Sequence, residues 1–256
     1  MKNKIFRLLG IILLLFVFIA LILTPMHKKA PVKKAPALRG RIAIVIDDWG
    51  YSLNNLLIIE QIKQPLTCAV LPGLKNSNPV MQKLNSLGFE IILHLPMEPK
   101  ERYNLEKNTI TLGVDAEEIR KIFDQDLSSV ALAKGVSNHM GSRITEDKKA
   151  STLVMAETKR RKLYFFDSFV TGRSVCAAVA KQIKIKFAKR DVFLDNQDNP
   201  DYIQGQLVRL KYLARRQGTA IGIGHDRKGT LLVLKEMLPQ MEKEGYKFVF
   251  LSQVVR

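Results

Sequence analysis

The chain has 256 residues, of which 46% are hydrophobic and 25% charged, and its formal net charge is +17. This length and apolar content suffice for one large packed domain or two small ones, and they exclude a chain that is disordered throughout. Residues 1–41 hold nine Lys or Arg and no acid, which leaves +8 for the remainder. That excess fits a solvated basic face, which we prefer, or an anionic membrane surface or polymer as partner, and no basic stripe with interleaved aromatic residues indicates a nucleic-acid partner.

The first 24 residues have the pattern of a signal peptide or a membrane anchor. Three basic residues within positions 2–7 precede an uncharged run over residues 8–23, and four lysines follow it. A membrane-spanning helix needs about 17 to 25 residues, which residues 5–23 supply. No Ala-x-Ala cleavage site follows Leu23 closely, so we expect an uncleaved anchor in the cytoplasmic membrane. The domain behind it is then an exported one, periplasmic or otherwise extracytoplasmic.

Residues 25–40 mix Pro, Ala and Lys without an apolar period and are interpreted as an extended linker. The folded domain is expected over residues 41–256, where short apolar runs alternate with longer helix-like stretches. Strands that alternate with helices predict an α/β domain with a mainly parallel sheet. The apolar runs lie at 42–46, 67–71, 89–93, 163–166, 191–194, 219–223 and 247–251.

Several helices carry start or stop signals. Asp115 precedes two acidic residues at one expected helix start, and Asn199-Pro200 marks another. Gly88 and Gly245 are expected to end two more helices, the second of which Pro239 is expected to kink or divide.

The two cysteines, Cys68 and Cys176, lie in apolar runs and are predicted to be separate buried thiols.

Polar residues follow most of the apolar runs. In parallel α/β folds the carboxyl ends of the strands meet at one rim, where ligands bind. Three of the four histidines in the chain occupy such positions. Adjacent carboxylates at a rim can divide two tasks, cation binding and proton acceptance, and histidine nitrogens with one carboxylate suit catalytic zinc. The residues concerned are Asp47, Asp48, His94, Glu98, His139, Asp167, Ser168, Asp195, Asn196 and His225.

Six motifs in order, IVIDDWG, ILHLPMEP, SNHMGSRIT, FFDS, VFLDN and AIGIGH, resemble those of the divergent polysaccharide deacetylase family. The resemblance runs from about Arg41 to the C-terminus. It implies a distorted (β/α) barrel of about seven parallel strands. It also implies a metal-dependent esterase-like hydrolase, most simply with Zn²⁺, that removes acetyl groups from a peptidoglycan-like glycan of the cell envelope.

The resemblance assigns roles to matching residues. It makes Asp47 the catalytic base, Asp48 a metal ligand, and His225 the proton donor to the leaving group. His94 matches the first histidine of the family's His-x3-His motif, but Glu98 stands in place of the second.

Three ligand sets follow: Asp48 and His94 with Glu98, the same pair with His139, or all four residues. We prefer the set with His139, because zinc readily takes nitrogen ligands. The expected substrate-binding residues are Asn138, Ser142, Arg143, Asp167 and Asp195, and either of the last two could orient His225. The alternative function is that of a catalytically inactive glycan-binding or scaffold protein of the envelope.

Overall fold

The computed structural model describes residues 2–23, 37–101 and 103–256. The chain divides into two units, Met1–Ala35 and Pro36–Arg256. In the first, residues Lys2–Leu23 form the helix α1. Within the described ranges no helix is both long and apolar enough to cross a membrane. The linker predicted at 25–40 falls largely outside the described residues.

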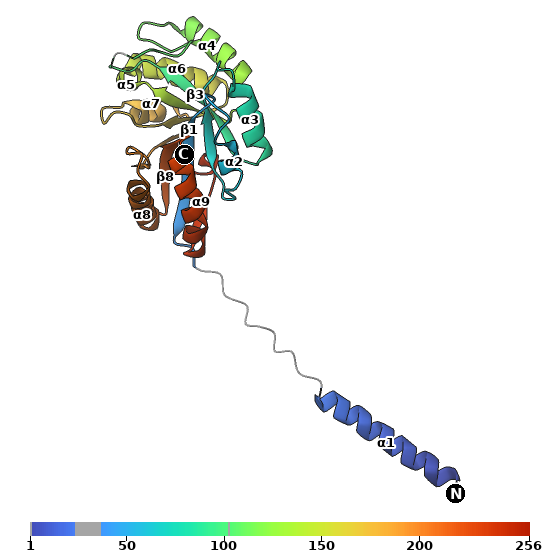
Figure 1. The fold of residues 1–256 in the computed structure, drawn as a ribbon. Coiled ribbons are helices and arrows are strands. Elements are labelled where there is room, and N and C mark those ends of the chain that lie inside the picture. Colours follow the sequence, from blue (N-terminus) through green and yellow to red (C-terminus); the bar gives the residue numbers. More distant parts are fainter. Residues whose placement is uncertain (1, 24–36, 102) are drawn as a thin grey trace. The chain divides into compact units, whose positions relative to one another are not determined.

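The second unit is built on one parallel sheet (Figure 1). Its strand order is β6-β5-β4-β3-β2-β1-β8-β7, with β9 paired to β1. The sheet curves into an open half-barrel, with β6 and β7 as the two edges. The strands are β1 (Gly40–Trp49), β2 (Thr67–Val70), β3 (Glu90–Met97), β4 (Gly135–Met140), β5 (Tyr164–Asp167), β6 (Phe187–Lys189), β7 (Val192–Phe193), β8 (Thr219–His225) and β9 (Tyr246–Phe248).

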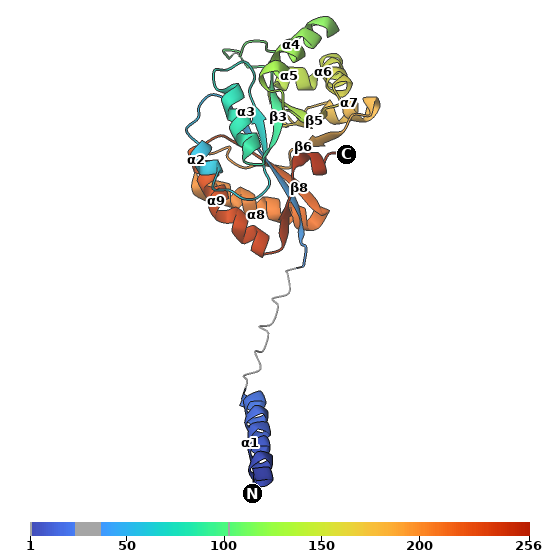
Figure 2. The ribbon, with the colours of Figure 1, turned by 90° about the vertical axis from the view of Figure 1, so that its right-hand side faces the viewer.

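Helices cover the outer side of this sheet (Figures 1 and 2). They connect successive strands, and α8 and α9 pack side by side next to β8, β1 and β9. The helices are α2 (Leu56–Ile59), α3 (Ser77–Ser86), α4 (Ala116–Ser129), α5 (Ser142–Glu146), α6 (Lys148–Arg160), α7 (Cys176–Ile183), α8 (Pro200–Gln217), α9 (Lys228–Lys243) and the 3₁₀ helix η1 (Leu251–Gln253).

Successive strand residues alternate between two apolar cores. The larger core lies between the sheet and the helices and includes Ile44, Leu93 and Phe165. The smaller core fills the inner side of the half-barrel and includes Val45 and Phe166. Each strand therefore has an outer face toward the helices and an inner face, and the inner face leads to the site described below.

The (β/α) half-barrel confirms the predicted fold class. The seven apolar runs correspond to β1, β2, β3, β5, β7, β8 and β9, and the sheet has two further strands, β4 and β6. Asp115 and Asn199 cap α4 and α8 through their side chains, as expected. Gly88 and Gly245 follow α3 and α9 with positive φ. Pro239 lies inside α9 and does not divide it, contrary to one of the two expectations.

Both cysteines are free and buried, which confirms the prediction of separate thiols.

Candidate active site

The register of the sheet brings Asp47 and His225 together. Asp47 of β1 is the direct neighbour of His225 in the parallel strand β8. Both continue the inner-face positions of their strands, because Val45 and Ile223 belong to the inner core. The two side chains therefore point into the open end of the half-barrel, with 3.9 Å between Asp47 Oδ1 and His225 Nε2.

Asp48 reaches the same space through an unusual backbone conformation. Strand alternation would direct its side chain to the outer face, but its φ is +61°, in the left-handed region. The β1–β2 register also shifts between Ile46 and Trp49. These two features turn the Asp48 carboxylate inward, above the end of β2, toward His94 of β3.

Three potential ligand atoms converge at this point. Asp48 Oδ1 lies 3.2 Å from His94 Nε2 and 3.0 Å from His139 Nδ1. The two imidazole nitrogens are themselves 3.2 Å apart. Ligands about 2.0 Å from a tetrahedral zinc ion are separated by roughly 3.3 Å, so this triangle suits such an ion. Two imidazoles and one carboxylate are also a zinc donor set.

Each imidazole has a polar partner on its far side, but only His94 is hydrogen-bonded to it, and within the described residues His139 Nε2 makes no hydrogen bond. His94 Nδ1 is 2.8 Å from Ser137 Oγ, and the two residues are neighbours in the β3–β4 register. His139 Nε2 lies 3.3 Å from Glu106 Oε1, which accepts a hydrogen bond from the Tyr51 hydroxyl at 2.6 Å. Such outer partners hold metal-binding imidazoles in one orientation. Sequence reasoning missed all three, because no pattern links them to the histidines.

His225 stands opposite the triangle and is paired with Asp195. Its Nδ1 is 2.9 Å from Asp195 Oδ1, and its backbone N–H donates to Asp195 Oδ2 at 2.8 Å. Thr230 donates a further hydrogen bond to Oδ2 at 2.6 Å. A Cβ at Gly224 would lie 3.4 Å from Asp195 Oδ2 and 3.1 Å from the Thr230 methyl, so the glycine keeps this approach uncrowded. Between the two expected partners of His225, the structure therefore selects Asp195.

The pKa values of the two central groups are both raised. Burial and the charge of Asp48 raise the pKa of Asp47 to about 8. Burial alone would lower the pKa of His225, but the hydrogen bond to Asp195 and the nearby carboxylates raise it to about 9. Among the described residues, Asp47 Oδ1 is buried without a hydrogen-bond partner. Near pH 7 the His225 imidazole is therefore protonated, and the Asp47 carboxyl exchanges its proton with a midpoint near pH 8.

The metal-ligand candidates titrate differently. Burial lowers the pKa of His94 to about 4, which keeps the ring neutral, as metal coordination requires. Burial would raise the pKa of Asp48, but its hydrogen bonds with His139 and His94 hold that pKa well below its usual range. Asp48 is therefore a carboxylate and His94 a neutral imidazole at any pH near 7.

A cavity of about 430 Å³ opens onto these groups. Asn138 lines it, but the Asn138 side chain is committed within the protein, accepting from the Ser168 N–H and donating to the Met140 carbonyl. Sequence reasoning missed most of the remaining wall. That wall consists of Tyr103, Met140, Ser168, Val170, Phe193 and Arg227.

Glu98 does not join the ligand triangle. Its carboxylate accepts from the Leu112 N–H at 2.7 Å and from Arg143 Nη1 at 2.8 Å. The chain leaves β3 after Met97, and the Glu98 N–H pairs with the carbonyl of Ile110. The side chain is consequently directed to the neighbouring loop, which corrects the alternative ligand sets that include Glu98.

Four of the expected substrate-binding residues lie away from the cavity wall. Gly141 has a φ of +87° and α5 begins after it, which carries Ser142 and Arg143 toward the loop at 98–101. Asp167 is 1% exposed and accepts hydrogen bonds from the Ser174 hydroxyl and the Phe169 N–H. It has the strand position of an outer-face residue, as Phe165 does. Asp195 is 0% exposed and bonds to His225, so it orients that ring and is not a substrate contact.

Comparisons with known proteins agree with this fold. The sequence model of the family described as divergent polysaccharide deacetylase matches residues 44–255. The uncharacterised protein YibQ of Escherichia coli (strain K12) is 37% identical over 204 residues, which are 80% of this chain and 64% of that protein. The chain thus matches less than two thirds of the length of this relative.

Two solved structures share the fold. An uncharacterised protein of Agrobacterium tumefaciens superposes with a TM-score of 0.79 at 24% identity, over 88% of this chain and 92% of the other. A family 4 carbohydrate esterase of Streptomyces lividans, in complex with acetate, gives a TM-score of 0.55 at 13% identity, over 85% and 96%. Since the family model spans nearly the whole second unit, the chain belongs to the divergent polysaccharide deacetylase family.

Proposed function

We propose that this protein is a metal-dependent hydrolase that removes acetyl groups from a polysaccharide of the cell envelope. One observation carries the proposal: the triangle of Asp48, His94 and His139 shares a cavity with an acid–base pair, Asp47 and His225. Membership of the deacetylase family supports an acetyl substrate.

Asp48 Oδ1, His94 Nε2 and His139 Nδ1 would hold the metal, and we propose Zn²⁺ because two imidazoles and one carboxylate are a ligand set of catalytic zinc. Such an ion supplies polarisation of the acetyl carbonyl and acidification of water. The outer partner Ser137 would keep the His94 ring directed at it.

Asp47 would act as the base. Its unpartnered Oδ1 faces the cavity beside the triangle, so it can take the proton of an attacking water. A base with a pKa near the working pH transfers protons most effectively, and the pKa of Asp47 is about 8.

His225 would donate a proton to the departing sugar nitrogen or oxygen. Its Nε2 faces the cavity, while Asp195 holds Nδ1 and stabilises the charged ring. Asp47 Oδ1 and His225 Nε2 are 3.9 Å apart, so both groups can act on the same substrate. Asp47 would gain the proton of the attacking water, and His225 would lose a proton to the leaving group.

The test compares acetate release and metal content in the full-length protein. The substrate is an acetylated glycan from the envelope, and zinc is supplied. Asp47→Asn and His225→Gln should each lower acetate release by about 10²-fold or more, the usual contribution of acid–base catalysis, while metal content stays near wild type. Glu118→Gln, an exposed carboxylate on α4, is the matched control and should change neither.

Two results would contradict the proposal. A protein that takes up no metal when zinc is supplied lacks the proposed chemistry. A protein that binds metal and glycan but releases no acetate is the alternative, a glycan-binding protein of the same fold.

We also propose an exported location, supported by the basic and apolar residues 2–23. Fusion of the second unit's C-terminus to alkaline phosphatase should give activity only if that unit is exported, and an inactive but intact fusion would contradict export.

A further inference from the structure

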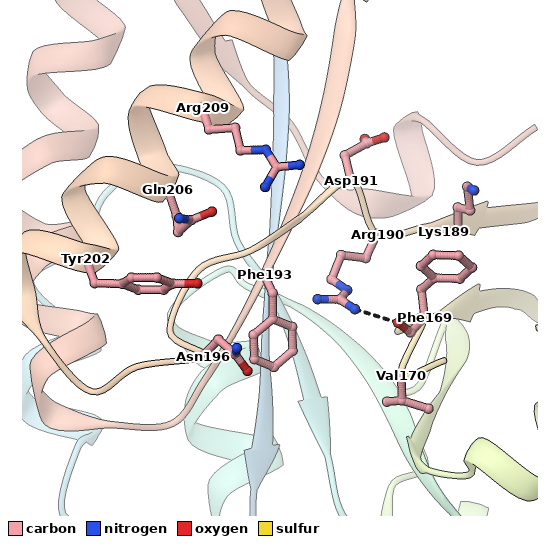
Figure 3. A pocket seen from close by; sticks show the side chains of 10 residues that line it. All are labelled: Phe169, Val170, Lys189, Arg190, Asp191, Phe193, Asn196, Tyr202, Gln206 and Arg209. Atoms are coloured by element: carbon pink, nitrogen blue, oxygen red, sulfur yellow. Dashed lines mark hydrogen bonds between the residues drawn. The ribbon is translucent and has the colours of Figure 1, made fainter. Parts of the chain in front are cut away.

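Figure 3 shows the residues that line a second, larger cavity. Its volume is about 650 Å³, within the range of ligand-binding clefts. Its origin is topological. Only Arg190 and Asp191 connect β6 to β7, whereas most successive strands are joined through helices that cover the sheet. The short link leaves a gap beside α8, and the loop after β5 forms its opposite wall.

The two cavities share part of their walls. Phe193 and Val170 line both of them. The Phe193 ring also packs edge-on against the His225 imidazole, with 5.2 Å between ring centroids. A polymer with one unit beside His225 can therefore continue past Phe193 into the larger cavity.

Positive charge dominates the wall of the larger cavity. Lys189, Arg190 and Arg209 line it, against the single carboxylate of Asp191. That carboxylate is already engaged, because Asp191 Oδ2 accepts the Ile221 N–H at 2.8 Å. Arg209 is exposed and extends from α8 into the space (Figure 3).

Arg190 is held in place and still has a free donor. Its guanidinium lies 4.4 Å from the centroid of the Phe193 ring and donates from Nη2 to the Phe169 carbonyl. Counting only described residues, its buried Nε has no hydrogen-bond partner. Guanidinium groups bind carboxylates through planar, paired hydrogen bonds, so an arginine held in place at the cavity wall suits such a ligand.

Apolar and amide groups complete the wall. Tyr202 and Phe193 present aromatic surface, and Gln206 and Asn196 present amides that can bond to hydroxyl groups (Figure 3). A small inorganic anion would leave most of this volume and its aromatic surface without contact. A sugar ring that carries a carboxylate would contact all three kinds of group.

We propose that this cavity is a binding subsite for an acidic, carboxylate-bearing sugar, adjacent to the acetylated sugar in the candidate active site. The inference rests on the proposed function for its polymer, and it adds the substrate class: an anionic rather than a neutral glycan.

Binding is measured calorimetrically with full-length Asp47→Asn protein, so that the substrate is not consumed. The acidic probe is a peptide-free oligosaccharide of alternating N-acetylglucosamine and N-acetylmuramic acid. The neutral probes are its methyl ester and an N-acetylglucosamine tetramer. We expect the acidic probe to bind at least about tenfold more tightly than either neutral probe, and rising salt to reduce the difference.

Arg209→Gln should remove most of that preference and leave the neutral probes unaffected. Arg190→Gln should have the same effect, but Arg190 also bonds to the backbone, so this variant can misfold. Arg209→Gln and Lys189→Gln change exposed side chains and keep the test valid in that case. Arg215→Gln, an exposed residue near the end of the same helix, is the matched control and should not change binding.

Equal affinity for acidic and neutral probes, an acidic preference that survives Arg209→Gln and Lys189→Gln, or no binding of the acidic probe would overturn the subsite. Inorganic phosphate is included as a competitor. Displacement by phosphate at concentrations matching the acidic probe would assign the site to free anions instead. Acetate release by the wild type tests the proposed function separately. The protein can release acetate without preferring acidic probes, and it can prefer acidic probes without releasing acetate.

Discussion

Asp47 and Asp48 reach the same cavity by different routes, although adjacent strand residues should face opposite sides of a sheet. Asp47 follows the inner-face alternation of β1, whereas Asp48 is turned inward by its φ of +61°. A non-glycine residue in this conformation costs about 1 kcal/mol or more, and such strain gathers at functional sites. The arrangement separates the roles of the two carboxylates, because Asp48 meets both histidines and Asp47 Oδ1 stays without a hydrogen bond.

Ser137 is predicted to tune metal binding without being a ligand. Its hydroxyl is the partner of His94 Nδ1, so Ser137→Ala would release the ring from one orientation. Loss of such a partner usually lowers metal affinity by about 10- to 100-fold. Zinc competition titration of the purified protein should show this loss, with an unchanged circular dichroism spectrum. Ser86→Ala, an exposed serine on α3, should leave the affinity as it is; an equal effect of both changes would refute the role.

Asp126 on α4 makes stability depend on pH. Burial raises the pKa of this carboxyl from its ordinary value near 3.8 to about 6, and its hydrogen bond from Asn108 only partly opposes the rise. The folded state therefore binds the proton more tightly than the unfolded state. The resulting stabilisation is complete below about pH 3.8 and is lost as the pH rises through 6.

Asp126→Asn keeps an oxygen for Asn108 and removes the charge. The free energy of unfolding of this variant, relative to wild type, should increase by about 2 kcal/mol between pH 4 and pH 8. Urea unfolding at the two pH values measures the difference. Asp124→Asn, which alters a largely exposed carboxylate on the same helix, should show a much smaller change. A constant difference for Asp126→Asn would mean that its pKa is not raised.

At the scale of the elements, the rule that the carboxyl ends of parallel strands meet at one rim was sufficient to predict that five residues lie close together: Asp47, Asp48, His94, His139 and His225. The sequence could not tell which face each strand end presents, because buried parallel strands are apolar on both faces. Asp167 is the last residue of the strand YFFD, and for this reason its outer-face position could not be predicted. Glu98 and Arg143 were misplaced because their positions depend on where the chain leaves β3 and β4. The short, charged β6 has too few apolar residues to be recognised.

The N-terminal cap of α8 offers a test of how firmly this helix is held beside the larger cavity. Asn199 Oδ1 accepts the Tyr202 N–H at 3.0 Å, and Pro200 occupies the first turn. Asn199→Ala should lower the free energy of unfolding by about 1 kcal/mol, or the melting temperature by roughly 2–4 °C. Asn199→Asp retains an acceptor and should remain close to wild type. Equal losses in both variants would indicate that the capping bond is not the cause.

At the scale of the whole molecule, the two edge strands of the half-barrel do not pair with each other. The C-terminal residues close the end of the barrel at which β2 and β3 begin. The Leu251 N–H donates to Thr67 Oγ1, and the Ser252 N–H donates to Glu90 Oε1. Thr67 and Glu90 are the first residues of β2 and β3, so these bonds lie at the end of the sheet opposite the site. Arg256 then exchanges two backbone hydrogen bonds with Phe187 of β6. The last residues thereby join the middle of the sheet to one of its edges.

The C-terminal residues that stabilise the barrel and the candidate active site lie at opposite ends of the strands. A substitution of Leu251 tests whether the two ends are independent. Its side chain is 0% exposed within the inner core, so Leu251→Ala should lower the free energy of unfolding by about 2–5 kcal/mol. The ligand triangle lies at the other end of the strands, so the folded variant should still bind zinc at the wild-type ratio. Ser252→Ala changes the adjacent, exposed side chain and keeps its backbone bond, so it should cost little. Urea unfolding and metal analysis of the same samples test both expectations. A small loss of stability in Leu251→Ala would show that the C-terminus does not close the barrel. A loss of zinc from the folded variant would show that the two ends of the barrel are coupled.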